Sequence, residues 1–219
     1  MPPSKRIRYC PVPGCGLRTN SFRSQYCQRH ARLYREYGHP EGDQLMLHEL
    51  KPYLRTTGQI IRDNLDHPDI QHVLGWIQRF LDQGEYMLSQ DAKTTGQDTR
   101  RWLGILQAEE ITPQAILEMI LAAGFMFHQR PHRFKDIRHY RHTVIHRVLK
   151  LARGYQKGSI RPATRELLSL RLLNPLFDYC RTLARLHYRE WEDTDLTMLE
   201  KAKSYNGFDF LPTANNLPS

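Results

Sequence analysis

Tyr9-Cys-Pro-Val-Pro-Gly-Cys15 and Tyr26-Cys-Gln-Arg-His30 are two short segments that hold three of the four cysteines of this 219-residue chain. The histidine, three residues after the last of these cysteines, completes a set of four side chains of the kinds that bind zinc. Segments this short bury too few apolar side chains to offset the entropy lost when their loops become ordered. The pattern therefore predicts a Zn²⁺ ion held by Cys10, Cys15, Cys27 and His30.

The spacing of these four residues suits a closed tetrahedral site. A Pro-Val-Pro-Gly turn separates Cys10 from Cys15, and Gly14 permits the tight backbone that aims both thiolates at one ion. Cys27 and His30 are three residues apart, so they share one face where a helix begins. We therefore expect each pair to supply half of a Cys3His site.

Alternative uses of these residues stay open at this point. A disulfide would leave one of the three clustered cysteines unpaired, because Cys180 lies far away in an apolar stretch. Free thiols are the other alternative. No signal peptide precedes the cluster, so we expect a reducing, cytoplasmic location. His39 is a substitute for His30 as the fourth ligand.

Cys27-x-x-His30-x-x-x-Tyr34-Arg35-x-x-Gly38-x-Pro40 resembles the short zinc module of many bacteriophage and mobile-element proteins, where it often accompanies an HNH nuclease. The resemblance covers about the first forty residues. It departs from the family pattern at Ala31, where the module usually has an aromatic residue, and at His39, where it usually has an aspartate. Nothing downstream resembles the nuclease motif, so the resemblance implies a nucleic-acid context without cleavage.

Charge is unevenly distributed along the chain. The formal net charge is +9, but residues 1–40 carry eight Lys and Arg against one acid, and residues 128–190 carry fifteen against four. An excess of acids separates these two basic blocks, and a smaller one follows the second block. Such asymmetry is typical of proteins that bind a polyanion, although acidic and basic helices packed side by side would produce it too. No apolar run is long enough to span a membrane.

Apolar residues recur at helical spacing beyond the Gly38-His-Pro-Glu-Gly42 break, and little alternating pattern typical of strands is found. The sequence thus predicts a mainly α protein with a zinc module over 1–40, a helical domain over 41–204 and a disordered tail over 205–219. Trp76 and Cys180 are expected in the core. Helices are expected over 43–64 with a bend or break at Pro52 and Gly58, and over 67–87, 100–108, from 113, 134–153, 161–173, 176–191 and 193–204, with a surface loop over 89–99 and a stop at Asn174-Pro175.

The helix expected over 134–153 has a basic face. Its apolar residues fall in a narrow arc, and we expect His139, His142, His146, Lys150 and Arg153 on the opposite, solvent-facing side. Three interpretations compete: contact with phosphates or bases, a second metal site formed by the three histidines, and an ordinary solvated face or protein interface.

The leading hypothesis is a non-catalytic, zinc-containing, nucleic-acid-binding accessory protein of a phage or mobile element, with DNA favoured over RNA. The expected phosphate contacts are Arg29, Arg32 and Arg35 on the zinc module, and Arg138, His142, Arg147, Lys150 and Arg153 on the second helix. The alternative is a protein-interaction adaptor in a larger complex. A metal-dependent nuclease that uses the histidine row is a third hypothesis, but no nucleophile or phosphate-loop motif supports enzymatic activity.

Overall fold

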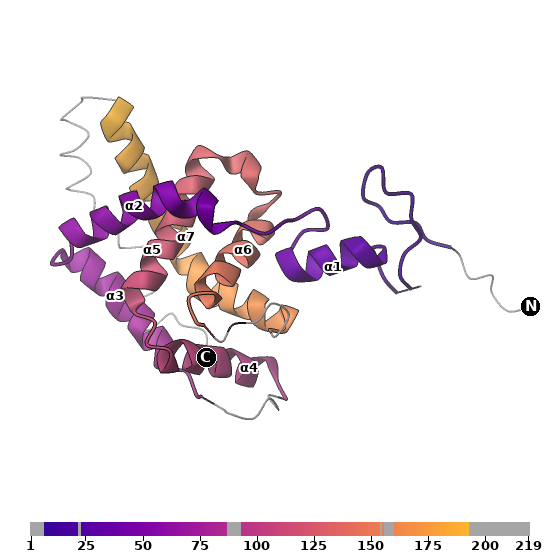
Figure 1. The fold of residues 1–219 in the computed structure, drawn as a ribbon, viewed down its shortest axis with the longest axis horizontal. Coiled ribbons are helices and arrows are strands. Elements are labelled where there is room, and N and C mark those ends of the chain that lie inside the picture. Colours follow the sequence, from indigo (N-terminus) through magenta and orange to yellow (C-terminus); the bar gives the residue numbers. More distant parts are fainter. Residues whose placement is uncertain (1–6, 22, 87–92, 154, 156–159, 193–219) are drawn as a thin grey trace, which may run out of the picture.

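A computed structural model describes residues 7–21, 23–86, 93–153, 155 and 160–192. The described part of the chain is mainly helical, as the sequence predicts. Its helices are α1 (Gln28–Tyr37), α2 (Leu47–Asp63), α3 (Pro68–Leu81), α4 (Thr95–Ala108), α5 (Pro113–Gln129), the 3-10 turn η1 (Pro131–Arg133), α6 (Ile137–Leu149) and α7 (Pro162–Glu192). Figure 1 shows α2 to α7 gathered into one body, from which α1 and the loops before it project on one side.

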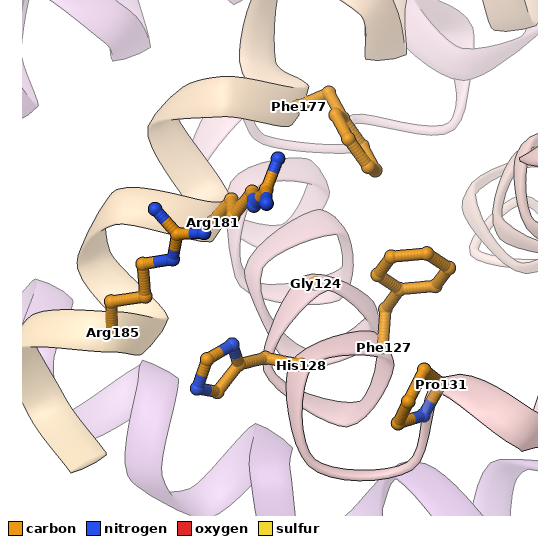
Figure 2. A pocket seen from close by; sticks show the side chains of 7 residues that line it. All are labelled: Gly124, Phe127, His128, Pro131, Phe177, Arg181 and Arg185. Carbon is orange, nitrogen blue, oxygen red and sulfur yellow. The ribbon is translucent and has the colours of Figure 1, made fainter.

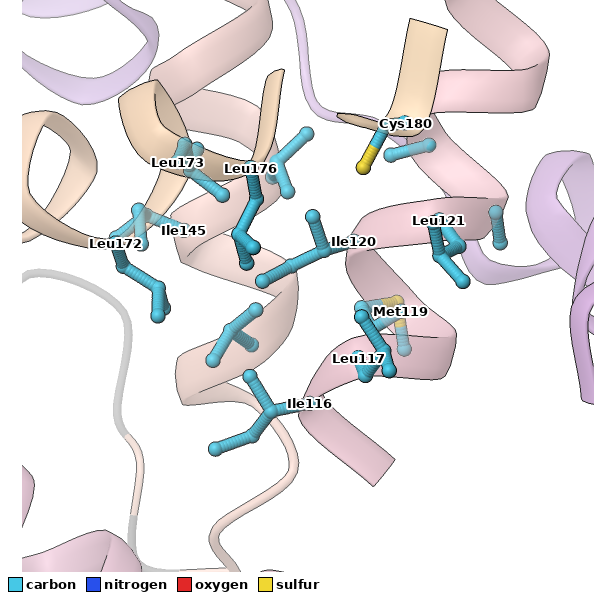
Figure 3. Close-up of a cluster of buried hydrophobic side chains, with 14 of the residues drawn as sticks. Ile116, Leu117, Met119, Ile120, Leu121, Ile145, Leu172, Leu173, Leu176 and Cys180 are labelled. Carbon is cyan, nitrogen blue, oxygen red and sulfur yellow. The ribbon is translucent and has the colours of Figure 1, made fainter. Parts of the chain in front are cut away.

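Helix α5 lies at the centre of the body. From Met119 to Phe127 it is apolar on all sides, which is typical of a helix buried by its neighbours rather than of a surface helix. Ile116 and Ile120 of α5 point toward α6 and α7, where Leu172 and Leu176 are buried (Figure 3). Its start is the predicted one, because the Thr112 side chain accepts a hydrogen bond from the backbone N–H of Ala115 and Pro113 occupies the first turn.

Helix α7 runs without interruption through Asn174-Pro175, where the sequence predicts a stop. A proline inside a helix removes one backbone hydrogen bond and costs about 3 kcal/mol. Leu172, Leu173 and Leu176, which surround Pro175, are all buried, and each such side chain contributes about 1.5–3 kcal/mol. The predicted stop is therefore wrong, because burial on both sides of the proline outweighs the lost bond.

Several other helix bounds differ from the predicted ones: α2 begins at Leu47 rather than 43, α3 ends at Leu81 rather than 87, and α6 spans Ile137–Leu149 rather than 134–153. Helix α2 passes through Pro52 and Gly58 unbroken. Helix α4 begins at Thr95, within the segment expected to be a surface loop, because Thr94 and Gln97 form a reciprocal capping box. The helix expected over 193–204 and the tail over 205–219 lie outside the described residues.

The core contains the two residues that the sequence assigns to it. Trp76 packs against Phe80, and Cys180 is buried. Of the described helices, no single one is long and apolar enough to cross a membrane, while α4 and α5, which meet at 112°, reach the required length and hydropathy only as a bent pair.

Candidate metal centre and the adjoining basic surface

The four predicted ligands come together at the N-terminal end of α1. Their ligand atoms all lie within 4.8 Å of one another. His30 Nδ1 is 3.3 Å from Cys10 Sγ and 3.4 Å from Cys27 Sγ, and the sulfurs of Cys15 and Cys27 are 3.7 Å apart. Thiolates that share a tetrahedral ion at metal–sulfur distances of about 2.3 Å have sulfurs about 3.8 Å apart. The cluster therefore has the dimensions of a metal site, and none of the four cysteines of the chain forms a disulfide.

The first ligand pair lies on a small hairpin. Tyr9 and Arg18 form an antiparallel bridge, flanked by a hydrogen bond from the Cys10 N–H to the Leu17 carbonyl at 2.8 Å. The chain reverses between them through a turn in which the Cys15 N–H donates to the Val12 carbonyl. Gly14 and Gly16 have φ values of 72° and 60°, the left-handed region that glycine adopts at little cost. These turns bring the two thiols to the same side of the hairpin.

The second pair begins a helix. Cys27 is the N-cap residue of α1, and its carbonyl accepts the first helical hydrogen bond, from the Ala31 N–H. His30 follows in the first turn, so its imidazole faces the thiol of Cys27. His39, the alternative fourth ligand, is not in the cluster, because its Nδ1 accepts a hydrogen bond from the Glu41 N–H at 3.1 Å.

The environment favours an ionised sulfur at one ligand. Burial raises the pKa of the Cys10 thiol, but hydrogen bonds with the backbone of Cys27 and Val12 and with the His30 ring outweigh it and lower the pKa to about 6. A thiolate is the form that binds a metal ion.

The C-terminal end of α1 attaches the cluster to the helical body. Gly38 ends the helix with φ 80°, and its N–H donates to the Tyr34 carbonyl at 2.9 Å. Arg165 of α7 donates to the last carbonyls of α1, those of Arg35 at 3.0 Å and Glu36 at 2.6 Å. A cation at a helix C-terminus interacts favourably with the helix dipole. This buried guanidinium therefore anchors α1 to α7.

A second set of contacts joins α1 to α6. The guanidinium of Arg138 lies 4.4 Å from the centre of the Tyr34 ring, donates to its hydroxyl and forms an ion pair with Glu166 at 2.9 Å. Nε2 of His142 also lies 2.7 Å from Glu166. Burial lowers the pKa of His142 despite this carboxylate. Glu166 and Arg165 are thus interface residues that the sequence alone does not single out, because their partners lie more than twenty residues away.

The predicted basic face of α6 is mostly buried, so the expectation that it points to solvent is wrong for His139, His142, His146 and Arg147. The segment that follows α1 covers it: His139 contacts the backbone of Asp43 at 2.9 Å, and Arg147 donates to the Leu45 carbonyl. Arg138, half-buried, is held by Glu166. Lys150 and Arg153, at and beyond the end of α6, are exposed as expected.

The three histidines do not share an ion. Nδ1 of His139 accepts from the Lys135 N–H at 3.1 Å, His142 lies against Glu166, and Nδ1 of His146 lies 2.8 Å from the Tyr155 hydroxyl. Across the ranges that the structure describes, the Cys3His cluster is the one group of Cys, His, Asp and Glu side chains placed to hold a metal. The second metal site considered for α6 is therefore not formed.

Arginines surround the metal cluster. Six are exposed, and the described residues before His39 include one acid, Glu36, whose carboxylate lies 3.9 Å from Nε of Arg32. The six are Arg8, Arg18, Arg23, Arg29, Arg32 and Arg35. We refer to residues 7–40 as the metal module. Comparison of the chain with protein-family models, with curated proteins and with solved structures found no match.

Proposed function

We propose that this protein binds nucleic acid through its metal module, with Zn²⁺ as a structural ion. Three thiolates and an imidazole are a ligand set that suits zinc. Four protein ligands fill a tetrahedral shell and leave no position for a substrate. The role that this geometry favours for the ion is to hold the hairpin and the start of α1 together.

The six exposed arginines of the metal module are the observation that carries this proposal. Guanidinium groups donate paired hydrogen bonds to phosphate oxygens, and a surface with such an excess of them attracts a polyanion. Arg29, Arg32 and Arg35 lie on one short helix, so contacts made by them would share one rigid support. The nearby Glu36 offsets one charge at most.

The second contact region is smaller than the sequence suggests. Of its predicted members, Lys150 and Arg153 are exposed. His142 and Arg147 are buried, and Arg138 already pairs with Glu166. The resemblance of residues 27–40 to zinc modules of phage and mobile-element proteins favours a DNA partner and an accessory, non-catalytic role.

A salt titration tests the proposal. Binding of the purified protein to double-stranded and single-stranded oligonucleotides is measured as the salt concentration rises. The slope of log K against log salt changes by about 0.9 for each phosphate contact on duplex DNA. The triple variant Arg29→Gln, Arg32→Gln, Arg35→Gln should therefore bind more weakly, with a slope reduced by roughly 2–3.

The matched control removes three exposed arginines from the helical body: Arg62→Gln, Arg79→Gln and Arg171→Gln. It should bind much as the wild type does. Absence of binding at low salt would refute the proposal. Equal losses in the two triple variants would show a general charge effect, and the metal module would lose its assigned role.

A protein-interaction adaptor is the second candidate, and the hairpin surface favours it. Ile7, Tyr9 and Leu17 are 56%, 61% and 56% exposed, so three large apolar side chains of one hairpin face solvent. Size-exclusion chromatography with and without an oligonucleotide separates the two. Co-elution that salt abolishes supports nucleic-acid binding, whereas self-association that is indifferent to salt supports the adaptor.

A further inference from the structure

A pocket outside the metal module combines aromatic walls with cationic side chains. Figure 2 shows it between the C-terminal part of α5 and the middle of α7, with Gly124 at its base. Its volume is about 380 Å³, within the range of roughly 300–1,000 Å³ that is usual for small-molecule sites. It is lined by Phe127, His128, Pro131, Phe177, Arg181 and Arg185 as well as Gly124.

The aromatic side of the pocket is rigid. The Phe127 ring meets those of Phe177, Phe134 and Tyr140 at centroid distances of 5.7, 5.6 and 5.0 Å. Tyr140 is fully buried, so Phe127 is held from behind by the core. A ring fixed in this way offers a preformed surface on which a planar ligand can stack.

The other side of the pocket is cationic. Arg181 and Arg185 lie one turn apart on α7 and are both exposed. Like charges at this spacing disfavour each other. Neither guanidinium forms an ion pair with an acid whose side chain the structure describes, which leaves out Glu190 and Glu192. His128 lies on the same side, and its ring stacks on Tyr188 at 5.9 Å. Among the side chains that the structure describes, those that line the pocket include no acid.

We propose that this pocket binds an aromatic phosphate, a nucleotide being the simplest example. Because the Phe127 and Phe177 rings are inclined at 67° to each other, the base would stack on the face of one ring and contact the other at its edge. The phosphate would accept hydrogen bonds from Arg181 and Arg185. Two guanidinium groups one helical turn apart suit a phosphate, because its oxygens can accept from both. An apolar ligand without charge would leave this cationic side unused, and inorganic phosphate would leave the aromatic side unused.

Titration of the full chain with AMP, adenosine and inorganic phosphate tests both halves of the pocket. AMP should bind at least about tenfold more tightly than either of the others, because it alone meets both sides. The double variant Arg181→Gln, Arg185→Gln should weaken AMP binding by about tenfold or more. The control Arg79→Gln, Arg171→Gln removes the same charge from helix surfaces outside the pocket and should leave AMP binding unchanged.

Phe177→Leu gives an independent measurement of the aromatic side. It should weaken AMP binding and leave the weak binding of inorganic phosphate as it was. Equal affinities for AMP and inorganic phosphate in the wild type would overturn the proposal. So would AMP binding that is the same in the pocket double variant and in its control.

Competition identifies where the nucleotide comes from. If AMP displaces a single-stranded oligonucleotide from the protein, the pocket takes a nucleotide of a strand; if both bind together, it takes a free nucleotide. The triple variant of Arg29, Arg32 and Arg35 should keep its AMP affinity. This variant therefore distinguishes loss of AMP binding at the pocket from loss of nucleic-acid binding at the metal module.

Discussion

Replacement of Gly38 by alanine tests how the metal module is joined to the helical body. Gly38 has φ 80° at the end of α1. A Cβ atom at this position would lie 2.9 Å from the carbonyl oxygen of Arg138 and 3.0 Å from Cγ of His142. Real Cβ contacts are rarely so short, and a backbone oxygen within α6 cannot rotate away.

The expected cost has two parts. A residue other than glycine adopts the left-handed conformation at a cost of about 1–2 kcal/mol. Inserting a methyl group into a packed contact adds about 1–3 kcal/mol. Gly38→Ala should therefore remove about 2–5 kcal/mol from the free energy that holds α1 against α6.

Amide hydrogen exchange measures this change directly, because it reports local opening separately from global unfolding. A loss of about 2 kcal/mol corresponds to roughly 30-fold faster exchange of the α1 amides. The α5 amides, which lie in the core, should be much less affected. Gly75→Ala is the control: it lies within α3, where a Cβ would meet only Arg79 Nη1 at 3.6 Å.

Alanine has the higher helix propensity, so Gly75→Ala should be neutral or stabilising by up to about 1 kcal/mol. If the α1 amides of Gly38→Ala exchanged at the wild-type rate, the close contact between Gly38 and α6 would not be what positions the metal module. Faster exchange throughout both variants would also refute the reasoning, because the effect would then not depend on the site.

Three further predictions concern metal and pH. Chelation or Cys27→Ala should release one zinc per chain and expose the amides of residues 7–30 to hydrogen exchange. The unfolding transition of the helical body, reported by buried Trp102, should persist, because the metal module and the helical body have separate apolar clusters. Glu166→Gln should lower the free energy of unfolding at pH 7 by about 1–3 kcal/mol in denaturant titrations. Burial would raise the pKa of Glu166, but hydrogen bonds from His142 and Arg138 hold it below its usual value. The stability that ionised Glu166 contributes to the wild type should therefore be lost as pH falls through that lowered pKa. Glu166→Gln has no carboxylate at this position and should show no such loss. Burial lowers the pKa of His139, so the wild type should lose stability below pH 6.5, by up to about 1.4 kcal/mol per pH unit, and denaturant titrations should show a shallower loss in His139→Gln.

The basic helix shows where a pattern in the sequence misleads. A narrow arc of apolar residues predicts that the opposite side of α6 faces water. In the structure, α5 and α7 cover one side, while α1 and the segment containing Asp43 and Leu45 cover much of the other. Histidine and arginine can be buried when a carbonyl or carboxylate meets them, as Leu45 meets Arg147 and Glu166 meets His142. Periodicity cannot supply this information, because the partners come from elsewhere in the chain.

Some helix boundaries could likewise be predicted from the sequence, and others could not. The start of α5 was predictable, since Thr112 and Pro113 act on the backbone next to them. The passage of α7 through Pro175 was not, since leucines buried against other helices oppose the local preference. Neighbouring residues in the sequence therefore determine a helix end only where contacts with other helices do not oppose them.

The sequence alone determines the mainly helical class and the metal cluster of Cys10, Cys15, Cys27 and His30. The cluster is predictable because its four ligands lie within about twenty residues of one another, its turns contain glycines, and a metal ion accepts few coordination geometries. Only the tertiary structure determines which positive charges reach solvent. Exposure is a property of a residue's neighbours in space, and for the α6 side chains those neighbours lie as many as a hundred residues away in the chain.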